Sequence, residues 1–302
     1  MKNELNLSVF FIVLEVVTPV FLLATIGFSW VKFGFEYRVE FVTRLAMTLA
    51  VPALVFTSLT QNTINPIFLS EMIIIVCLAY AVVSIMALIF TFIFKLDIRT
   101  FLMPIISGNT GNLGLPLCFL AFGQDGLGYA VIVFAFTSIV AFTLGLWVIS
   151  GVHSFKQPFK EPLVPATILG LVFMFYDWEI PKTLTNALNL IAQMAIPLML
   201  ITLGVAVARI KTTLGFKTIG ISVSKIIIGI FAAVAVGHQF SLPYEAYAVL
   251  IIQMSMPVAV TSYLLAEKYG ANSEAVAGLV VISTLLTIFI TPVLLSFLLI
   301  YV

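Results

Sequence analysis

The stretch at residues 107–116, with the sequence SGNTGNLGLP, decides the fold class. It places three glycines, two asparagines, a serine and a threonine in the middle of a long apolar run, and it ends on a proline. Residues of this kind interrupt a helix and leave backbone N–H and C=O groups without helical partners. Inside a membrane, such backbone is tolerated only where protein or a wet cavity covers it. The sequence therefore predicts a helix that is broken near the middle of a membrane.

The composition around this stretch is that of a membrane protein. Hydrophobic residues make up 62% of the 302 residues and charged residues 9%, with a net charge of +1. This excludes a soluble enzyme, a nucleic-acid-binding protein and a disordered chain. A membrane-crossing helix needs roughly 20 residues. Apolar runs then mark ten predicted spans, at residues 8–31, 39–59, 72–94, 101–122, 127–149, 163–176, 186–207, 219–236, 247–266 and 275–301.

The basic residues divide unevenly between the two sets of predicted loops. Most of the 14 lysines and arginines follow odd-numbered spans: Lys32, Arg38, Arg44, Lys95, Arg99, Lys156, Lys160, Arg209, Lys211, Lys217 and Lys268. The opposite side receives Lys2 and Lys182, and Lys225 lies inside the eighth span. The positive-inside rule therefore predicts a multi-pass protein of the cell (inner) membrane, with both termini outside the cytoplasm.

Pairs of predicted spans resemble each other in the same order along the chain. The second and seventh spans read LAMTLAVPALVFTSL at 45–59 and LIAQMAIPLMLITLG at 190–204. The fourth and ninth contain NLGLP at 112–116 and QMSMP at 253–257. Each match is weak alone, but their common order indicates an internal repeat.

The repeat fixes the direction of the two halves. The fifth and tenth spans continue the match, with FTS at 136–138 against IST at 282–284. Five helices per half is an odd number, so the second half must cross the membrane in the opposite sense. We therefore predict an all-α membrane protein of two inverted five-helix repeats, residues 1–152 and 153–302, an architecture typical of secondary transporters.

Polar residues at the two predicted breaks form the candidate binding site. They are Asn109, Thr110, Asn112, Gln253, Ser255 and Pro257. Two broken helices that cross at matching repeat positions would direct helix N-termini, with partial positive charge and free N–H groups, toward one point. Such a point can bind a small anion without an arginine in the membrane. The alternative is that these small and polar residues only let the helices pack closely.

Two charged residues inside spans have open roles. Lys225 either snorkels toward the cytoplasmic interface, or it faces the crossing and offsets the negative ends of helices or takes part in coupling. Glu15 either lies near the outer interface or is a candidate for proton coupling. Pro52 and Pro197 either kink their helices or open them toward the site. Both cysteines lie inside apolar runs, which favours buried thiols over a disulfide or a metal site.

The sequence resembles the auxin efflux carrier family, the bacterial relatives of the PIN-type carriers of plants, over nearly its whole length. The segments that carry the resemblance are VPALVF at 51–56, GNLGLPLCFLAFG at 111–123, MAIPLMLITLG at 194–204, SVSKIII at 222–228 and residues 253–286. The resemblance implies ten helices in two inverted repeats, with broken fourth and ninth helices that cross. It also implies an elevator-like movement against a scaffold of helices one, two, six and seven.

The family resemblance also implies a function. Its members carry small organic anions, such as indole acetate in plants and malonate or malate in bacteria. On this resemblance Asn112, Pro116 and Pro257 lie at the crossing. Lys225 matches a lysine usual in the eighth helix, and Thr57 helps to line the substrate cavity. A proton or sodium as coupling ion and a homodimer in the lipid bilayer are left open.

Other functions are weighed against this one. The main alternative is a sodium-coupled symporter of the bile-acid type, which has a related fold but uses a carboxylate where this chain has Gln253. A sodium/proton antiporter needs acidic ligands in the membrane, whereas Asp97, Asp125 and Asp177 fall in predicted loops. A channel fits broken helices less well than a carrier does. An intramembrane enzyme would need a nucleophile with its base or a metal cluster. We find neither pattern and expect no enzymatic activity, metal or cofactor.

Overall fold

The structure is a computed structural model that describes residues 2–61, 64–150, 161–210 and 215–299. Within these ranges the chain is helical, and its one β feature is an isolated antiparallel bridge. Lys156, Lys160 and Lys211 of the orientation argument, and the predicted boundary between residues 152 and 153, lie outside the described residues.

The described part of the chain contains seven helical stretches that are long and apolar enough to cross a membrane. They are Phe10–Lys32, Val39–Gln61, Ile67–Ile93, Thr110–Ser150, Lys182–Arg209, Phe216–Gly237 and Ser273–Leu299, and Leu163–Phe175 is a shorter apolar helix. The predicted multi-pass membrane protein is therefore confirmed.

The elements are best given in two groups. The first comprises α1 (Lys2–Lys32), α2 (Val39–Leu45), η1 (Ala46–Ala50), α3 (Val51–Gln61), α4 (Pro66–Ile93), α5 (Ile98–Ile106), η2 (Thr110–Gly114), α6 (Leu115–Val140), η3 (Ala141–Gly145) and α7 (Leu146–Ser150). The second comprises α8 (Leu163–Phe175), α9 (Lys182–Gln193), α10 (Ala195–Arg209), α11 (Phe216–Gly237), α12 (Tyr244–Ser255), α13 (Val260–Lys268) and α14 (Ser273–Leu299). The η segments are single π-helical stretches between α-helical ones.

Prolines explain two irregularities in otherwise continuous helices. The π-helical turn η1 ends two residues before Pro52, and α9 passes into α10 through Met194, three residues before Pro197. A proline cannot donate to the preceding turn and its ring crowds that turn. The π-helical stretch η1 accommodates this before Pro52, and the interruption at Met194 does so before Pro197. The two prolines therefore disturb their helices at the positions that the sequence comparison of the second and seventh spans matched.

The chain changes direction inside α6 at Gly123. This residue has a φ of 64° and a ψ of −149°, a conformation that residues with a Cβ rarely adopt. Residues 115–122 and 124–140 are therefore two helical segments joined by one glycine. The change lies at the predicted boundary between the fourth and fifth spans.

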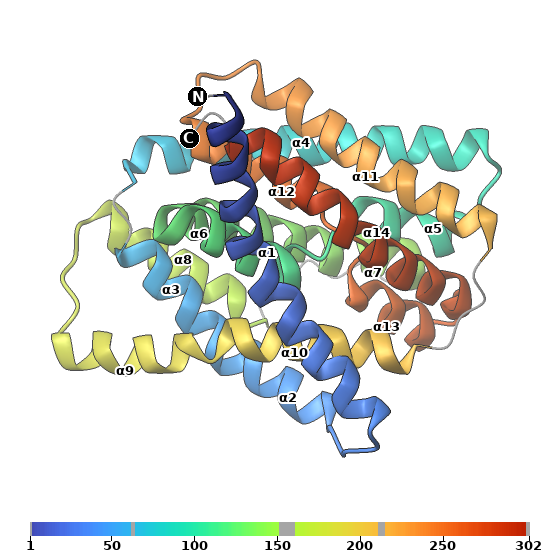
Figure 1. The fold of residues 1–302 in the computed structure, drawn as a ribbon, viewed down its shortest axis with the longest axis horizontal. Helices are drawn as coiled ribbons and strands as arrows, with labels where there is room; N and C mark the ends of the chain where they lie inside the picture. The colour runs from blue at the N-terminus through green and yellow to red at the C-terminus, as the bar shows by residue number, and fades with distance from the viewer. Residues whose placement is uncertain (1, 62–63, 151–160, 211–214, 300–302) are drawn as a thin grey trace.

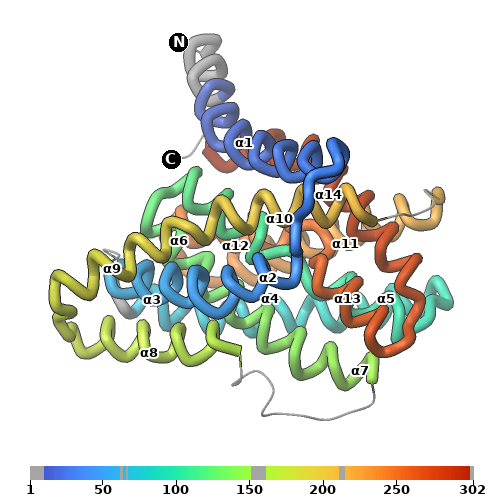
Figure 2. The backbone as a smooth tube through the Cα atoms, turned by 90° about the horizontal axis from the view of Figure 1, so that it is seen from below, coloured from blue at the N-terminus to red at the C-terminus, as the bar shows by residue number. Residues whose placement is uncertain are grey.

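Close packing determines where the elements meet. α1 lies across α10 (Figures 1 and 2), and a Cβ on Gly27 or on Gly204 would overlap a backbone carbonyl of the other helix. Small residues of this kind let membrane helices approach closely. α12 packs between α6 and α11, and its residues 248–255 are all buried. The core of the molecule is therefore built around the ninth predicted span, one of the two with a polar break.

Candidate functional site

The chain interrupts its helices after α5 and after α12, and the two interruptions meet. The Asn109 N–H donates to the Pro257 carbonyl at 2.7 Å, and the Ala259 N–H donates to the Ser107 carbonyl at 3.3 Å. These two bonds form the antiparallel bridge between segments far apart in the sequence. Each break therefore satisfies part of the backbone that the other leaves without helical partners.

Local sequence explains why the second helix stops where it does. Met256 precedes Pro257 and is extended, with a φ of −57° and a ψ of 147°, as a residue before proline prefers. In the first half Ser107 is also extended, with a φ of −87° and a ψ of 114°. The glycine that follows it lies against Lys225 and Met256, since a Cβ there would lie 3.2 Å from the lysine Nζ and 3.4 Å from the Met256 carbonyl oxygen.

The helices resume next to each other. η2 begins at Thr110 after Asn109, and α13 begins at Val260 after Ala259. Neither preceding residue caps its helix with a side chain. The first N–H groups of a helix have no partner inside it, and this end carries partial positive charge. Two helix starts with N–H groups that no side chain caps therefore lie at the crossing.

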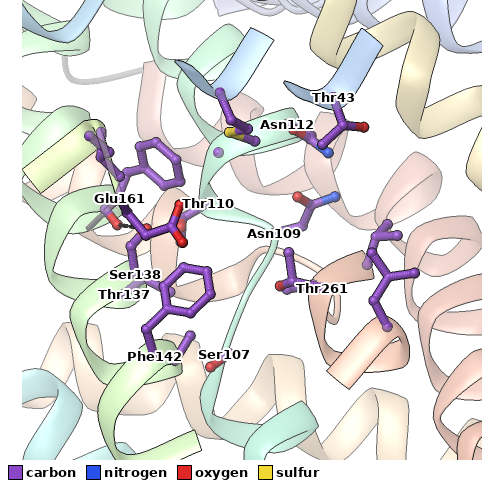
Figure 3. A pocket seen from close by; sticks show the side chains of 18 of the residues that line it. Thr43, Ser107, Asn109, Thr110, Asn112, Thr137, Ser138, Phe142, Glu161 and Thr261 are labelled. Carbon is purple, nitrogen blue, oxygen red and sulfur yellow. Dashed lines mark hydrogen bonds between the residues drawn. The ribbon is translucent and has the colours of Figure 1, made fainter. Parts of the chain in front are cut away.

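A cavity of about 780 Å³ opens beside these helix starts (Figure 3). This volume lies within the usual range of small-molecule sites. Its polar and charged lining comes from α2, η1, the first break, η2, α6, α13 and Glu161, which lies two residues before α8. The residues are Glu40, Thr43, Arg44, Thr48, Ser107, Asn109, Thr110, Asn112, Thr137, Ser138, Glu161 and Thr261.

Three of the predicted binding residues line this cavity. They are Asn109, Thr110 and Asn112. Asn109 is 5% exposed, and its amide nitrogen is buried without a hydrogen-bond partner among the described residues. Asn112 is half-buried, and Figure 3 shows it at the cavity near Thr43 of α2. The structure therefore brings the asparagines of the first break to an open cavity.

The other predicted binding residues lie away from the cavity wall. Pro116 is buried in the first turn of α6. Thr57 and Ser255 are buried, and the hydroxyl group of each donates a hydrogen bond to a carbonyl of its own helix. Thr57 donates to the Ala53 carbonyl at 2.9 Å and Ser255 to the Ile252 carbonyl at 2.7 Å. Their predicted contact with a substrate stays a prediction.

Gln253 lies behind the crossing and is fully buried in α12. A Cβ on Gly114 would overlap its amide, so the two residues hold α12 against η2. Neither polar atom of the amide has a hydrogen-bond partner among the described residues. This geometry suits a residue that positions the first break.

Lys225 points toward the crossing. It is 2% exposed in α11 and donates to the Met256 carbonyl at the end of α12. That carbonyl lies at the negative end of its helix, where a cation is favourable. A Cβ on Gly108 would lie 3.2 Å from the lysine Nζ, so the ammonium touches both breaks. Glu15, in contrast, is exposed on α1 and does not line the cavity.

Several residues that line the cavity were not predicted from the sequence as site residues. Arg44 counted only as an orientation signal, and Glu161 as part of a loop. Thr43 and Thr261 sit at the ends of predicted spans, where a polar residue is unremarkable. Ser138 carried a usable signal, because it belongs to the repeat match between the fifth and tenth spans. The other lining residues can be recognised only in the structure, where α2 and the start of α8 lie beside the first break.

The residues that the sequence comparison matched with this part of the fifth span lie at the other break. Ser283 of α14 is fully buried and accepts a hydrogen bond from the Val258 N–H at 2.9 Å. In the first half, Thr137 and Ser138 line the cavity beside Thr110 (Figure 3). Each of the two matched polar stretches, 136–138 and 282–284, therefore lies next to a break.

Comparison with known proteins points to transport. The family described as "Membrane transport protein" matches residues 12–154 and, a second time, residues 147–295. An uncharacterized transporter of Methanocaldococcus jannaschii is 24% identical over 290 residues, which cover 90% of this chain and 94% of that protein. An uncharacterized transporter of Methanothermobacter thermautotrophicus is 25% identical over 298 residues, 92% of this chain and 96% of the relative.

A third relative has a name that specifies a substrate. A protein of Rhizobium meliloti named "Putative malonate transporter" is 24% identical over 264 residues. The match covers 80% of this chain and 81% of the relative.

Proposed function

The chain belongs to the membrane transport protein family, and from this premise we propose that it is a secondary transporter that moves a small organic anion, a carboxylate, by alternating access. The family match confirms the predicted resemblance to the auxin efflux carriers. The relative named as a malonate transporter supports a carboxylate as the substrate class.

We propose ten spans in two inverted repeats, residues 1–152 and 153–302. One of the seven long apolar stretches, Thr110–Ser150, divides at Gly123 into the end of the fourth span, which begins with α5, and the whole of the fifth span. The short α8 and the broken span α12 with α13 add two more, which gives ten. The two family matches fall on the two halves of the chain, which supports the repeat. Five spans per half makes the halves opposite in direction.

The observation that carries the proposed function is the pair of helix starts beside the cavity. The free N–H groups at the starts of η2 and α13 can donate to a carboxylate, and the amides of Asn109 and Asn112 add donors from the wall. A hydrogen bond to a charged group contributes about 1.5–3 kcal/mol. A few such bonds suffice for micromolar to millimolar affinity, which suits a carrier that must also release its substrate.

We propose that the cavity opens to the cytoplasm. Its outer lining comes from the start of α2, the start of α8 and α13 toward Lys268, and these ends lead to the loops that carry most basic residues. Release on the other side then requires the crossing to move relative to its surroundings. An elevator-like movement against α1, α2, α3, α8, α9 and α10 is the form that the family resemblance implies.

A sodium-coupled symporter of the bile-acid type remains the alternative. Against it, the buried position beside the crossing holds the Gln253 amide, and Lys225 already places a positive charge there. A sodium ion and an ammonium in contact with the same carbonyl would repel each other. Sodium-independent transport would separate the two hypotheses.

Uptake of radiolabelled malonate, malate and indole acetate into proteoliposomes tests the proposal, with and without sodium. We expect the protein to take up at least one of them above empty liposomes, without sodium. Asn112→Leu should weaken binding by about 10- to 150-fold, the equivalent of the ~1.5–3 kcal/mol that one hydrogen bond to a charged group contributes. Asn186→Leu, an exposed change on α9, is the matched control and should bind normally. Equal activity of both variants would remove the proposed site.

A further inference from the structure

The wall of the cavity that faces the first break carries a carboxylate. Glu161 is half-buried and directly precedes Pro162, which begins the turn into α8. Figure 3 shows its side chain directed into the cavity, beside Thr110 and across from Asn109. An anion held by the helix starts and the asparagines would therefore share the cavity with a second negative group.

The charged groups that line the cavity among the described residues do not neutralise the charge of Glu161. Among the described residues that line the cavity, Glu40 and Arg44 of α2 are the other charged groups. The first break, η2, the stretch 134–142 and α13 contribute neutral lining residues. Arg44 is exposed and has no carboxylate within 4.0 Å among the described residues, whose one ion pair joins Arg38 to Glu36. Among the described residues, the lining thus holds two negative groups and one positive group, although its helix starts attract an anion.

We propose that Glu161 takes up one proton when the anion binds, so that the transporter carries an anion together with a proton. This inference rests on the proposed function. Two like charges in a partly enclosed cavity are poorly screened, and protonation of one of them removes their repulsion. The proton comes from the water of the cavity and binds a carboxylate oxygen of Glu161, and it leaves when the anion leaves. No other reactant is needed.

Other acidic residues are placed less well for this role. Glu15 is exposed on α1 and outside the cavity. Glu40 is exposed at the rim on α2, where water screens its charge. Lys225 is separated from the cavity by the crossing and is engaged by the Met256 carbonyl. Glu161 alone among these is half-buried, lines the cavity and faces the asparagines.

Proton counting by titration calorimetry tests the inference on the purified full-length protein. Oxalate is the probe, because it is already a dianion between about pH 6 and pH 8 and takes up no proton itself. The measured heat is compared across buffers that differ in ionisation enthalpy, which gives the number of protons bound with the ligand. We expect close to one proton per oxalate, and an affinity that falls about tenfold for each pH unit.

The variant Glu161→Gln should bind oxalate without proton uptake and with an affinity that no longer depends on pH. Glu179→Gln, a change at an exposed acidic residue that does not line the cavity, is the matched control and should keep the proton uptake of the unmodified protein. Three results would overturn the inference and leave the proposed function standing. The unmodified protein could bind oxalate without proton uptake, the uptake could persist in Glu161→Gln, or binding could require sodium in place of a proton. If oxalate, malonate, malate and indole acetate all fail to bind at every pH, the proposed function falls, and this inference falls with it.

Discussion

Single side chains at the crossing divide into those that face the cavity and those that hold the breaks in place. Asn109 and Asn112 belong to the first group, and Gln253 and Lys225 belong to the second. The division explains how a site for an anion can exist beside a buried lysine that does not line it. The lysine donates to the carbonyl at the negative end of α12, whereas the asparagine amides and the helix starts face the cavity.

The role of Lys225 can be separated from its contribution to stability. Burial of an ammonium is costly, and its hydrogen bond to the Met256 carbonyl offsets part of that cost. We expect Lys225→Met to change the free energy of unfolding by no more than about 1 kcal/mol, because an apolar side chain of similar length refills the site. Uptake should fall much further, about tenfold or more, because the end of α12 loses its compensating charge.

Parallel measurements of uptake and of thermal stability in detergent decide this prediction. Lys217→Met, at the exposed start of the same helix, provides a control for the loss of one positive charge. A variant at Lys225 that unfolds readily but transports normally per folded molecule would make this lysine a purely structural residue.

At the scale of elements, the end of α12 is fixed by its contact with α11. A Cβ on Gly229 would overlap the Met254 carbonyl, a backbone atom that cannot move without moving the break. On the same helix, a Cβ on Gly220 would meet nothing within 4 Å. The two glycines therefore offer a matched pair of substitutions.

We expect Gly229→Ala to destabilise the protein by about 1–3 kcal/mol through overpacking, and to reduce malonate uptake because the second break shifts. Gly220→Ala should be neutral or slightly stabilising, since alanine favours a helix over glycine by up to about 1 kcal/mol. Thermal unfolding of both variants in one detergent provides the comparison. Equal thermal unfolding midpoints for the two variants would show that α11 and α12 are packed less closely at Gly229.

The sequence predicted the breaks but not the cavity, and the reason is physical. Gly, Asn and Pro inside an apolar run are local signals, because they act on the helix that contains them. The residues of the cavity wall depend on which helices become neighbours. Thr43, Glu161 and Thr261 gave no local sign of their place, since each could equally have faced water at the end of a span.

The difference between local sequence signals and the packing of neighbouring helices also explains why some predicted site residues do not line the cavity. Thr57 has the polarity of a binding residue, but in α3 its hydroxyl donates to the preceding turn, a use that sequence cannot distinguish from substrate contact. Gln253 was predicted to lie at the second break; it lies in the last turn of α12, and its amide occupies the space beside Gly114.

At the scale of the whole molecule, the crossing ties together helices from both ends of the chain. α5 and η2 meet α12 and α13 at the two hydrogen bonds between the breaks, while α1 packs on α10 at a separate contact of small residues (Figure 1). This division into a crossing and a surrounding set of helices is what an alternating-access carrier requires, because one part must move while the other stays in the membrane.

The account depends on one claim, that a carboxylate binds between the starts of η2 and α13. Electron cryomicroscopy maps of the protein with and without saturating malonate test this most directly. We predict additional density in the cavity, with carboxylate oxygens about 3 Å from the Asn112 amide and from the first N–H groups of α13. Density at any other position, or continuous helices in place of the two breaks, would contradict the account.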